Sequence, residues 1–351
     1  MTLTELSYYL RRILPFFILF VLFFLIIFYS FKLYFTFLSL NKPKEPIVPR
    51  VFGNINPPEI KNSTSSANFT FVLDNIEGRP VTTTDSAKVY FLPKPTTRFG
   101  YREKIYLMAK TFGFNTEVVT HKLIDNLAVF DDGFKKLTID ISNFNFTFDN
   151  FSDKNFFTST DEGKIIPSEK EIENKAIDFL KEVGRYPDEL AKGKNQIIYL
   201  KYHPGFESYV NVDNPNEADL VEIDLYRQYP DEVPVVSPKF FNSQNYVVLR
   251  FLKNNKYQVL KAQIAFYEKS DSQFDIYPVK SGDLAWEELT KGKGYVVAAT
   301  KGKKDIIIKK MYLAYYDPDF YQSFLEPVYV FLGEDDFVAY LPAIANQFLI
   351  Q

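Results

Sequence analysis

The stretch ILPFFILFVLFFLIIFYSF, residues 13–31, carries no charged side chain over nineteen consecutive positions. As an α-helix it would be about 28 Å long, which matches the hydrocarbon thickness of a bilayer. Sixteen of its residues are Leu, Ile, Val or Phe, the types that favour insertion into lipid. The stretch therefore predicts a single transmembrane helix, with the rest of the chain tethered to the lipid bilayer through residues 13–31.

The flanking residues indicate how the chain is anchored. The apolar run is longer than the core of a cleaved signal peptide and is followed by Lys32 rather than by small residues, which predicts an uncleaved signal anchor. The sequence stays apolar to residue 40, so the helix is allowed to continue that far. The pair Arg11 and Arg12 favours a short cytoplasmic tail, residues 1–12, and an extracytoplasmic C-terminal domain at the cell membrane. A count of basic residues alone favours the opposite orientation, because two precede the span and four follow it before residue 51.

The composition beyond residue 50 excludes several classes of protein. The first fifty residues hold 6 of the 41 Lys and Arg residues and 2 of the 44 Asp and Glu residues, which leaves the remainder with a net charge of about −7. Such an acidic domain is a poor partner for nucleic acid. The absence of cysteine excludes disulfides, thiol catalysis, cysteine metal sites and cysteine lipidation. The 24 Tyr and 36 Phe residues are explained most simply as aromatic pairs between β-strands.

The organisation of the chain after the span follows from its turn residues and periodicity. Five prolines and then a Ser, Thr and Asn run predict a spacer over residues 41–68, with the fold starting near Phe69. Strand-like alternation dominates afterwards, interrupted by three helix-like segments that end at Gly113, Gly184 and Gly292. The first covers about residues 101–112, the second opens with a capping box of Ser168 and Glu171, and the third covers about residues 282–291. We therefore expect an α+β ectodomain with antiparallel sheets, built of two to three repeated helix-plus-sheet modules. The expected modules cover residues 69–160, 161–280 and 281–351.

Catalytic signatures are scarce in the sequence. The two histidines, His121 and His203, are far apart in sequence, and neither a G-x-S-x-G elbow nor a Walker-type phosphate loop occurs. The acidic turn 334–336 falls short of the oxygen ligands that calcium needs. The sequence therefore predicts no catalytic residue, no metal ligand and no cofactor. The basic turns 291–294 and 301–304 are read mainly as connections, and an anion or lipid-headgroup site stays open as the alternative.

The C-terminal segment has a recognisable order: the helix DLAWEELTKG, the strand IIIKKMYLAYYD and the hairpin LEPVYVFLGEDDFVAYLPAI. This order resembles the C-terminal module of the YycH/YycI regulatory proteins and of related PepSY-like extracytoplasmic domains, mainly over residues 281–345. The resemblance implies a membrane-anchored regulatory protein without catalytic residues, which modulates a sensor histidine kinase in that family. The residues at the matching positions are Tyr315, Tyr316, Pro327, Tyr329, Phe331, Tyr340 and Ala343. The five aromatic ones form the candidate interaction surface.

Three functional hypotheses follow. The first is a non-catalytic, membrane-anchored extracytoplasmic regulator or scaffold that acts through protein–protein contacts with an integral membrane partner, and it leaves a homo-oligomer open. The second is an envelope hydrolase whose cleft is assembled from scattered carboxylates. The third is an exterior sensor that binds a ligand in an aromatic-lined pocket.

Overall fold

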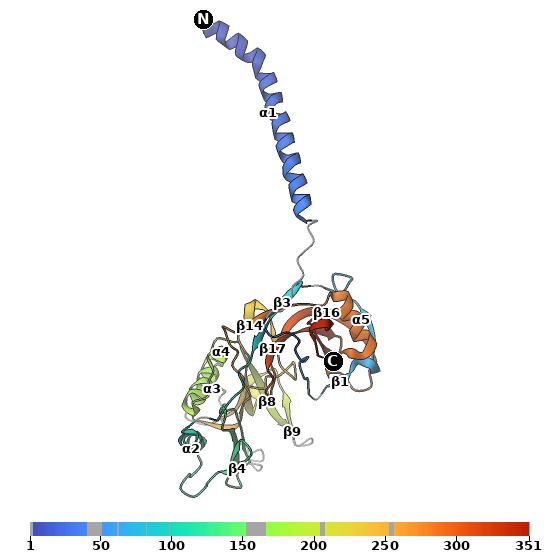
Figure 1. Cartoon of the computed structure of the whole chain (residues 1–351). Coiled ribbons are helices and arrows are strands. Elements are labelled where there is room, and N and C mark those ends of the chain that lie inside the picture. Colours follow the sequence, from blue (N-terminus) through green and yellow to red (C-terminus); the bar gives the residue numbers. More distant parts are fainter. Residues whose placement is uncertain are drawn as a thin grey trace. The chain divides into compact units, whose positions relative to one another are not determined.

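The chain forms two compact units, Met1–Ile47 and Val48–Gln351, which are described separately. The structure is a computed structural model, and its ribbon is shown in Figure 1. It describes residues 3–40, 51–61, 63–81, 83–97, 99–151, 166–203, 208–252 and 256–350.

The first unit contains one long helix, α1 (Leu3–Leu40), which Figure 1 shows in blue. Its segment Leu14–Thr36 has a mean hydropathy of 2.7, and none of this segment is buried against protein. Pro15 lies inside α1 without ending it. This helix is long and apolar enough to cross a membrane, as predicted for residues 13–31, and the helical backbone continues to residue 40.

The second unit contains two nine-stranded sheets. In the first sheet the strand order is β1-β15-β18-β17-β16-β11, with β2 parallel to β16 and β3 joining β17 to β14. The C-terminal hairpin of β17 and β18 is antiparallel, as expected. The strands of this sheet are β1 (Thr64–Ser65), β2 (Thr70–Leu73), β3 (Ser86–Phe91), β11 (Val235–Val236), β14 (Phe274–Pro278), β15 (Tyr295–Ala298), β16 (Asp305–Tyr316), β17 (Phe324–Gly333) and β18 (Val338–Pro342).

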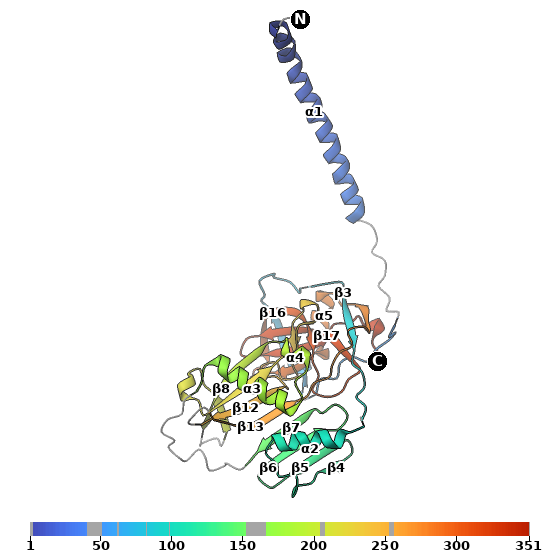
Figure 2. The same ribbon diagram turned by 90° about the vertical axis from the view of Figure 1, so that its left-hand side faces the viewer.

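The second sheet is antiparallel throughout, in the order β4-β5-β6-β7-β13-β12-β10-β8-β9. Helices α2 (Tyr101–Thr111) and α3 (Glu169–Val183) lie over one face of this sheet (Figure 2), and their apolar stripes form one core with it. Its strands are β4 (Lys122–Ile124), β5 (Leu127–Asp131), β6 (Lys135–Asp140), β7 (Phe146–Asn150), β8 (Asn195–His203), β9 (Ser208–Asn211), β10 (Leu220–Leu225), β12 (Tyr246–Phe251) and β13 (Tyr257–Ile264).

The remaining helices are short. Ser281 caps α5 (Gly282–Glu288), because its Oγ accepts a hydrogen bond of 3.2 Å from the amide of Leu284. Gly184 ends α3 in the left-handed conformation that the sequence predicts. Ser168 precedes α3, but its side chain makes no cap hydrogen bond, so the predicted capping box is not formed. The other short elements are α4 (Asp188–Ala191), the 3-10 turns Ser66–Asn68, Pro215–Glu217, Pro230–Glu232 and Asn346–Phe348, and the wide turn Leu289–Lys293.

The mixed α+β class with a sheet-rich domain after one apolar helix is confirmed. The hydrogen-bonded sheets do not follow the expected module boundaries, however. Strand β7 pairs with β13 across residue 160, and β14, which precedes residue 281, pairs with β3 near the start of the unit. The division into three repeated modules stays a prediction.

The folded unit begins before Phe69, because residues 51–68 already contribute to its interior. Ile55 and Ile60 are buried, and the amide of Ile55 donates a hydrogen bond of 3.0 Å to the carbonyl of Phe348. Ser66 is fully buried, where its Oγ donates to the carbonyl of Leu289 at 2.7 Å. The proline and serine content suggested a spacer, whereas the isolated isoleucines find apolar partners far along the chain. Residues 41–50, the rest of the predicted spacer, lie outside the described residues.

Candidate functional site: a lysine-lined pocket

The five aromatic residues of the predicted interaction surface are all in the interior. Each is at most 1% exposed. Two of them belong to one core cluster of the first sheet, two belong to a second cluster, and one belongs to a smaller third cluster. Three hydroxyl groups donate to backbone carbonyls: Tyr315 to Lys88 at 2.9 Å, Tyr329 to Lys280 at 2.6 Å and Tyr340 to Ser237 at 2.8 Å. These side chains are therefore core residues, and they form no surface in this structure. The five are Tyr315, Tyr316, Tyr329, Phe331 and Tyr340.

The two histidines are not brought together. His121 precedes β4 and His203 ends β8, strands that six others separate in the second sheet. At about 4.8 Å between neighbouring strands, the seven steps from β4 to β8 amount to roughly 34 Å along the sheet. The ring of His121 lies against Tyr106, with 3.2 Å between Nδ1 and the hydroxyl oxygen, and burial lowers the pKa of His121. A catalytic pair of histidines is therefore excluded by the sheet order.

The acidic turn between β17 and β18 is paired with lysines. Asp335 pairs with Lys303, and the Nζ of Lys309 lies 3.1 Å from a carboxylate oxygen of Glu334. In the part of the chain that the structure describes, no group of three or more His, Asp or Glu residues could hold a metal ion. This turn therefore neutralises neighbouring cations.

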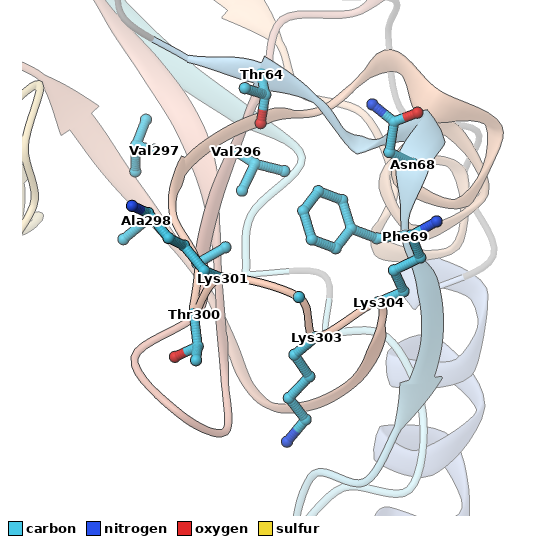
Figure 3. A pocket seen from close by; sticks show the side chains of 12 residues that line it. Thr64, Asn68, Phe69, Val296, Val297, Ala298, Thr300, Lys301, Lys303 and Lys304 are labelled. Carbon is cyan, nitrogen blue, oxygen red and sulfur yellow. The ribbon is translucent and has the colours of Figure 1, made fainter.

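A pocket of about 390 Å³ lies where the basic turn after β15 meets the segment before β2 (Figure 3). The ring of Phe69 points into it from one side, and the turn 300–304 borders the other. The turn reverses at Gly302, whose φ of +85° is a conformation that glycine adopts without strain. A hydrogen bond of 2.9 Å from the amide of Thr70 to the carbonyl of Lys304 joins the two sides. We call this site the lysine-turn pocket.

The lysine-turn pocket is positively charged. Its lining contains Lys301, Lys303 and Lys304 and no acidic residue. Lys303 points away from the ring of Phe69 and pairs with Asp335, and this hydrogen bond raises the pKa of Lys303. Lys301 and Lys304 are exposed, and no ion pair involves either of them among the described residues. Two ammonium groups beside an apolar floor suit a carboxylate or phosphate that carries an apolar substituent.

The other basic turn has a structural role. Lys291 pairs with Glu287, and Lys293 lies 3.1 Å from the buried carboxylate of Glu288. Gly292, at a φ of +85°, packs so closely that a Cβ there would approach Ala67 Cβ at 2.5 Å. The two basic turns have the same lysine and glycine pattern in the sequence, and only the ion pairs in the structure distinguish their roles.

A buried ionic network connects the two sheets, and sequence reasoning missed it. The fully buried Arg227 follows β10, and its Nη2 lies 2.8 Å from Asp317 Oδ1 at the end of β16. Its Nη1 donates to Glu189 Oε2 at 2.6 Å, and its Nη2 donates to the carbonyl of Tyr267 at 2.6 Å. Burial lowers the pKa of Arg227, but the two carboxylates raise it by more, so the guanidinium stays charged. Partners 38 and 90 residues away leave no local pattern in the sequence.

Two neighbouring carboxylates on β10 also have shifted pKa values. Burial, with a smaller contribution from repulsion by Glu222, raises the pKa of Asp224 to about 8. The Oδ2 of Asp224 accepts a hydrogen bond of 2.7 Å from the amide of Ser243, while its Oδ1 has no donor among the residues that the structure describes. Asp224 is 0% exposed, so an external substrate cannot touch it.

The comparisons with known proteins supply no family. No family model matches the sequence, and no curated protein matches it. Among solved structures, an uncharacterised protein from Eubacterium rectale is similar at 13% sequence identity and a TM-score of 0.35. The alignment covers 78% of this chain and 89% of that one.

Proposed function

We propose that this chain is a membrane-anchored extracytoplasmic regulator or scaffold that acts by binding a membrane protein and not by catalysis. The resemblance of residues 281–345 to YycH/YycI-like and PepSY-like proteins is part of this proposal. So is the idea that the modules containing α2 and α3 arose by duplication of one helix-plus-sheet unit. The observation that carries it is the exposed segment Leu14–Thr36 at the start of a sheet-rich protein. In the part of the chain that the structure describes, no protein covers its apolar side chains, and lipid is the environment that would cover them.

The lysine-turn pocket supports a role in binding. Its lining includes the ring of Phe69 together with Lys301 and Lys304, which make no ion pair with any residue that the structure describes, on a unit whose overall charge is negative. A partner segment with acidic residues beside one apolar side chain complements it in charge and shape. We therefore assign an acidic extracytoplasmic segment of an integral membrane protein as the occupant of this pocket.

Protease protection tests the anchor and its orientation. Intact cells that produce the full chain with a C-terminal epitope are treated with proteinase K, before and after permeabilisation. We expect loss of the epitope from intact cells, because the proposal places residues 48–351 outside the cytoplasm. Protection in intact cells, with digestion only after permeabilisation, would refute the extracytoplasmic placement.

Site-specific crosslinking tests the partner contact. A photoreactive residue at position 299, which lines the pocket, should capture an integral membrane protein in the parental chain. The double variant Lys301→Ala/Lys304→Ala should lose most of that adduct. The matched control Lys170→Ala/Lys181→Ala removes the same charge from the exposed side of α3 and should keep it. Equal adducts from both variants, or recovery of the chain alone, would contradict the proposal.

A further inference from the structure

Three side chains with complementary chemistry meet beside helix α5: the amine of Lys280, the carboxylate of Glu288 and the amide of Asn346. The Nζ of Lys280 lies 2.8 Å from Glu288 Oε2, and the Nδ2 of Asn346 donates a hydrogen bond of 2.7 Å to Glu288 Oε1. Because the two oxygens belong to one carboxylate, the amine and the amide are neighbours in space. We call these three residues the Lys280 cluster.

The backbone positions each member of the Lys280 cluster. Lys280 lies just before α5, and Glu288 is the last residue of that helix. The amide of Lys280 donates to the carbonyl of Ala343 at 2.8 Å, and its Nζ donates to the carbonyl of Pro342 at 2.9 Å. Asn346 begins the 3-10 turn that follows this segment. The residues before α5 and the C-terminal turn are therefore held side by side.

The amine and the carboxylate of the Lys280 cluster are shielded from water. Lys280 and Glu288 are each 4% exposed. Burial lowers the pKa of Lys280, although the hydrogen bond to Glu288 opposes this shift. Burial also disfavours the charged form of Glu288, but hydrogen bonds from Lys280 and Asn346 lower its pKa, so it stays a carboxylate that can accept a proton. A desolvated lysine beside a base is the arrangement that makes an amine nucleophilic.

We propose that Lys280 and Asn346 join through an intramolecular isopeptide bond, with Glu288 as the group that transfers protons. The Nζ of Lys280 forms a bond to Cγ of Asn346, and the bond between Cγ and Nδ2 breaks. Of the three protons on the ammonium group, one stays on the new amide nitrogen and two leave with Nδ2 as an ammonium ion. Glu288 accepts protons at Oε2, delivers them at Oε1 and ends as the carboxylate that it was.

The surroundings of the Lys280 cluster suit this reaction. Holding both reacting groups on one carboxylate replaces an encounter in solution by a step within one molecule, which is a large part of many rate enhancements. Asn346 is exposed, so the ammonium ion has a path to solvent. The exchange of one amide for another consumes no oxidant, cofactor or energy source.

An isopeptide bond would give this chain a covalent cross-link that its composition otherwise denies it. The chain contains no cysteine, so disulfides are excluded. A bond between residues 280 and 346 closes a long loop and restricts the unfolded chain as a disulfide does. It would fix the C-terminal turn to the start of α5. This inference does not depend on the partner contact proposed for the lysine-turn pocket.

Intact-mass spectrometry of the full chain, purified in detergent micelles, tests the bond. We expect a mass below that of the sequence by one molecule of ammonia. A tryptic digest should contain one branched peptide that joins the segments of Lys280 and Asn346. Cyclisation of Asn346 onto its own backbone also releases ammonia, but it connects no second peptide. An unshifted mass, or loss of ammonia without the branched peptide, would overturn the proposal, and this result decides it even where a variant does not fold.

Three variants test the role of each group. Lys280→Met should abolish the linkage, and Glu288→Gln should slow it by about a hundredfold or more, as expected for loss of a general base. The matched control is Lys293→Met, because Lys293 also lies 3.1 Å from Glu288 Oε1 but is not the proposed nucleophile, and it should stay linked. Thermal unfolding shows that each variant is folded before its mass is read. Linkage of Glu288→Gln at the parental rate, or its loss in folded Lys293→Met, would refute the assigned roles.

Discussion

Replacing Arg227 by Met tests the ionic network between the two sheets most directly. Methionine keeps a long unbranched side chain, but it removes the charge and every hydrogen bond to Asp317, Glu189 and the carbonyl of Tyr267. Asp317, only 3% exposed, would then keep Gln244 as a donor at 3.0 Å but would have lost its cation. Breaking one side of a buried ion pair costs about 3–5 kcal/mol of the free energy of unfolding. For a unit of this size that corresponds to roughly 5–8 °C in the thermal midpoint.

The assay is thermal and urea unfolding of the full chain in detergent micelles, followed by tyrosine and tryptophan fluorescence. Adding Asp317→Asn to the Arg227→Met background should recover part of the loss, because it removes the unpaired buried charge. Burial raises the pKa of Asp317 and the charge of Arg227 opposes that shift, so the Met variant should lose less stability at pH 5 than at pH 7. A loss below about 1 kcal/mol, or losses at the two sites that simply add, would refute the reasoning.

Three further predictions concern single buried sites. Because the pKa of Asp224 is about 8 in the folded state, Asp224 keeps its proton to a higher pH than it does in the unfolded chain, so stability falls from about pH 4 to pH 8. The variant Asp224→Asn should flatten this fall in thermal midpoints measured across that range. An unchanged slope would contradict the prediction. Burial raises the pKa of Glu326 well above its usual value, and its Oε2 has no partner among the described residues. The variant Glu326→Gln should therefore become more stable than the parental chain as the pH rises above neutral. A constant difference in thermal midpoint between pH 5 and pH 9 would argue against this prediction. A Cβ at Gly193 would lie 1.7 Å from the carbonyl oxygen of Tyr226. In urea unfolding, Gly193→Ala should therefore lower the free energy of unfolding by about 1–3 kcal/mol or more. This loss should exceed the loss of about 1 kcal/mol expected for Gly133→Ala, where the added Cβ meets no atom within 4 Å.

Local patterns in the sequence were sufficient for the helices and for one hairpin. The uncharged run 13–31 predicts α1, and the apolar spacing that ends at Gly113 and Gly184 predicts α2 and α3 close to their observed bounds. The glycines succeed as signals because a left-handed residue ends a helix whatever packs around it. The pairing of β17 with β18 follows from the short turn between them.

The burial of the five aromatic residues in the candidate interaction surface could not be predicted in the same way. Alternating aromatic residues such as Tyr329 and Phe331 show that a strand has two faces, but they do not show whether either face meets water. In the first sheet core clusters cover both faces, so residues expected outside are buried. The lysine-turn pocket depends on segments far apart in sequence, such as those of Phe69 and Lys304. No spacing rule connects such pairs.

Two buried arginines, Arg185 and Arg227, hold in place a segment that has no regular secondary structure. After β13 the chain is held from one side by Arg227, whose guanidinium carbon lies 4.0 Å from the centroid of the Phe266 ring and which binds the carbonyl of Tyr267. From the other side Arg185 binds the carbonyl of Phe266 and pairs with Glu268. Three consecutive residues are therefore fixed by ionic groups, although an apolar core would stabilise the fold at lower desolvation cost.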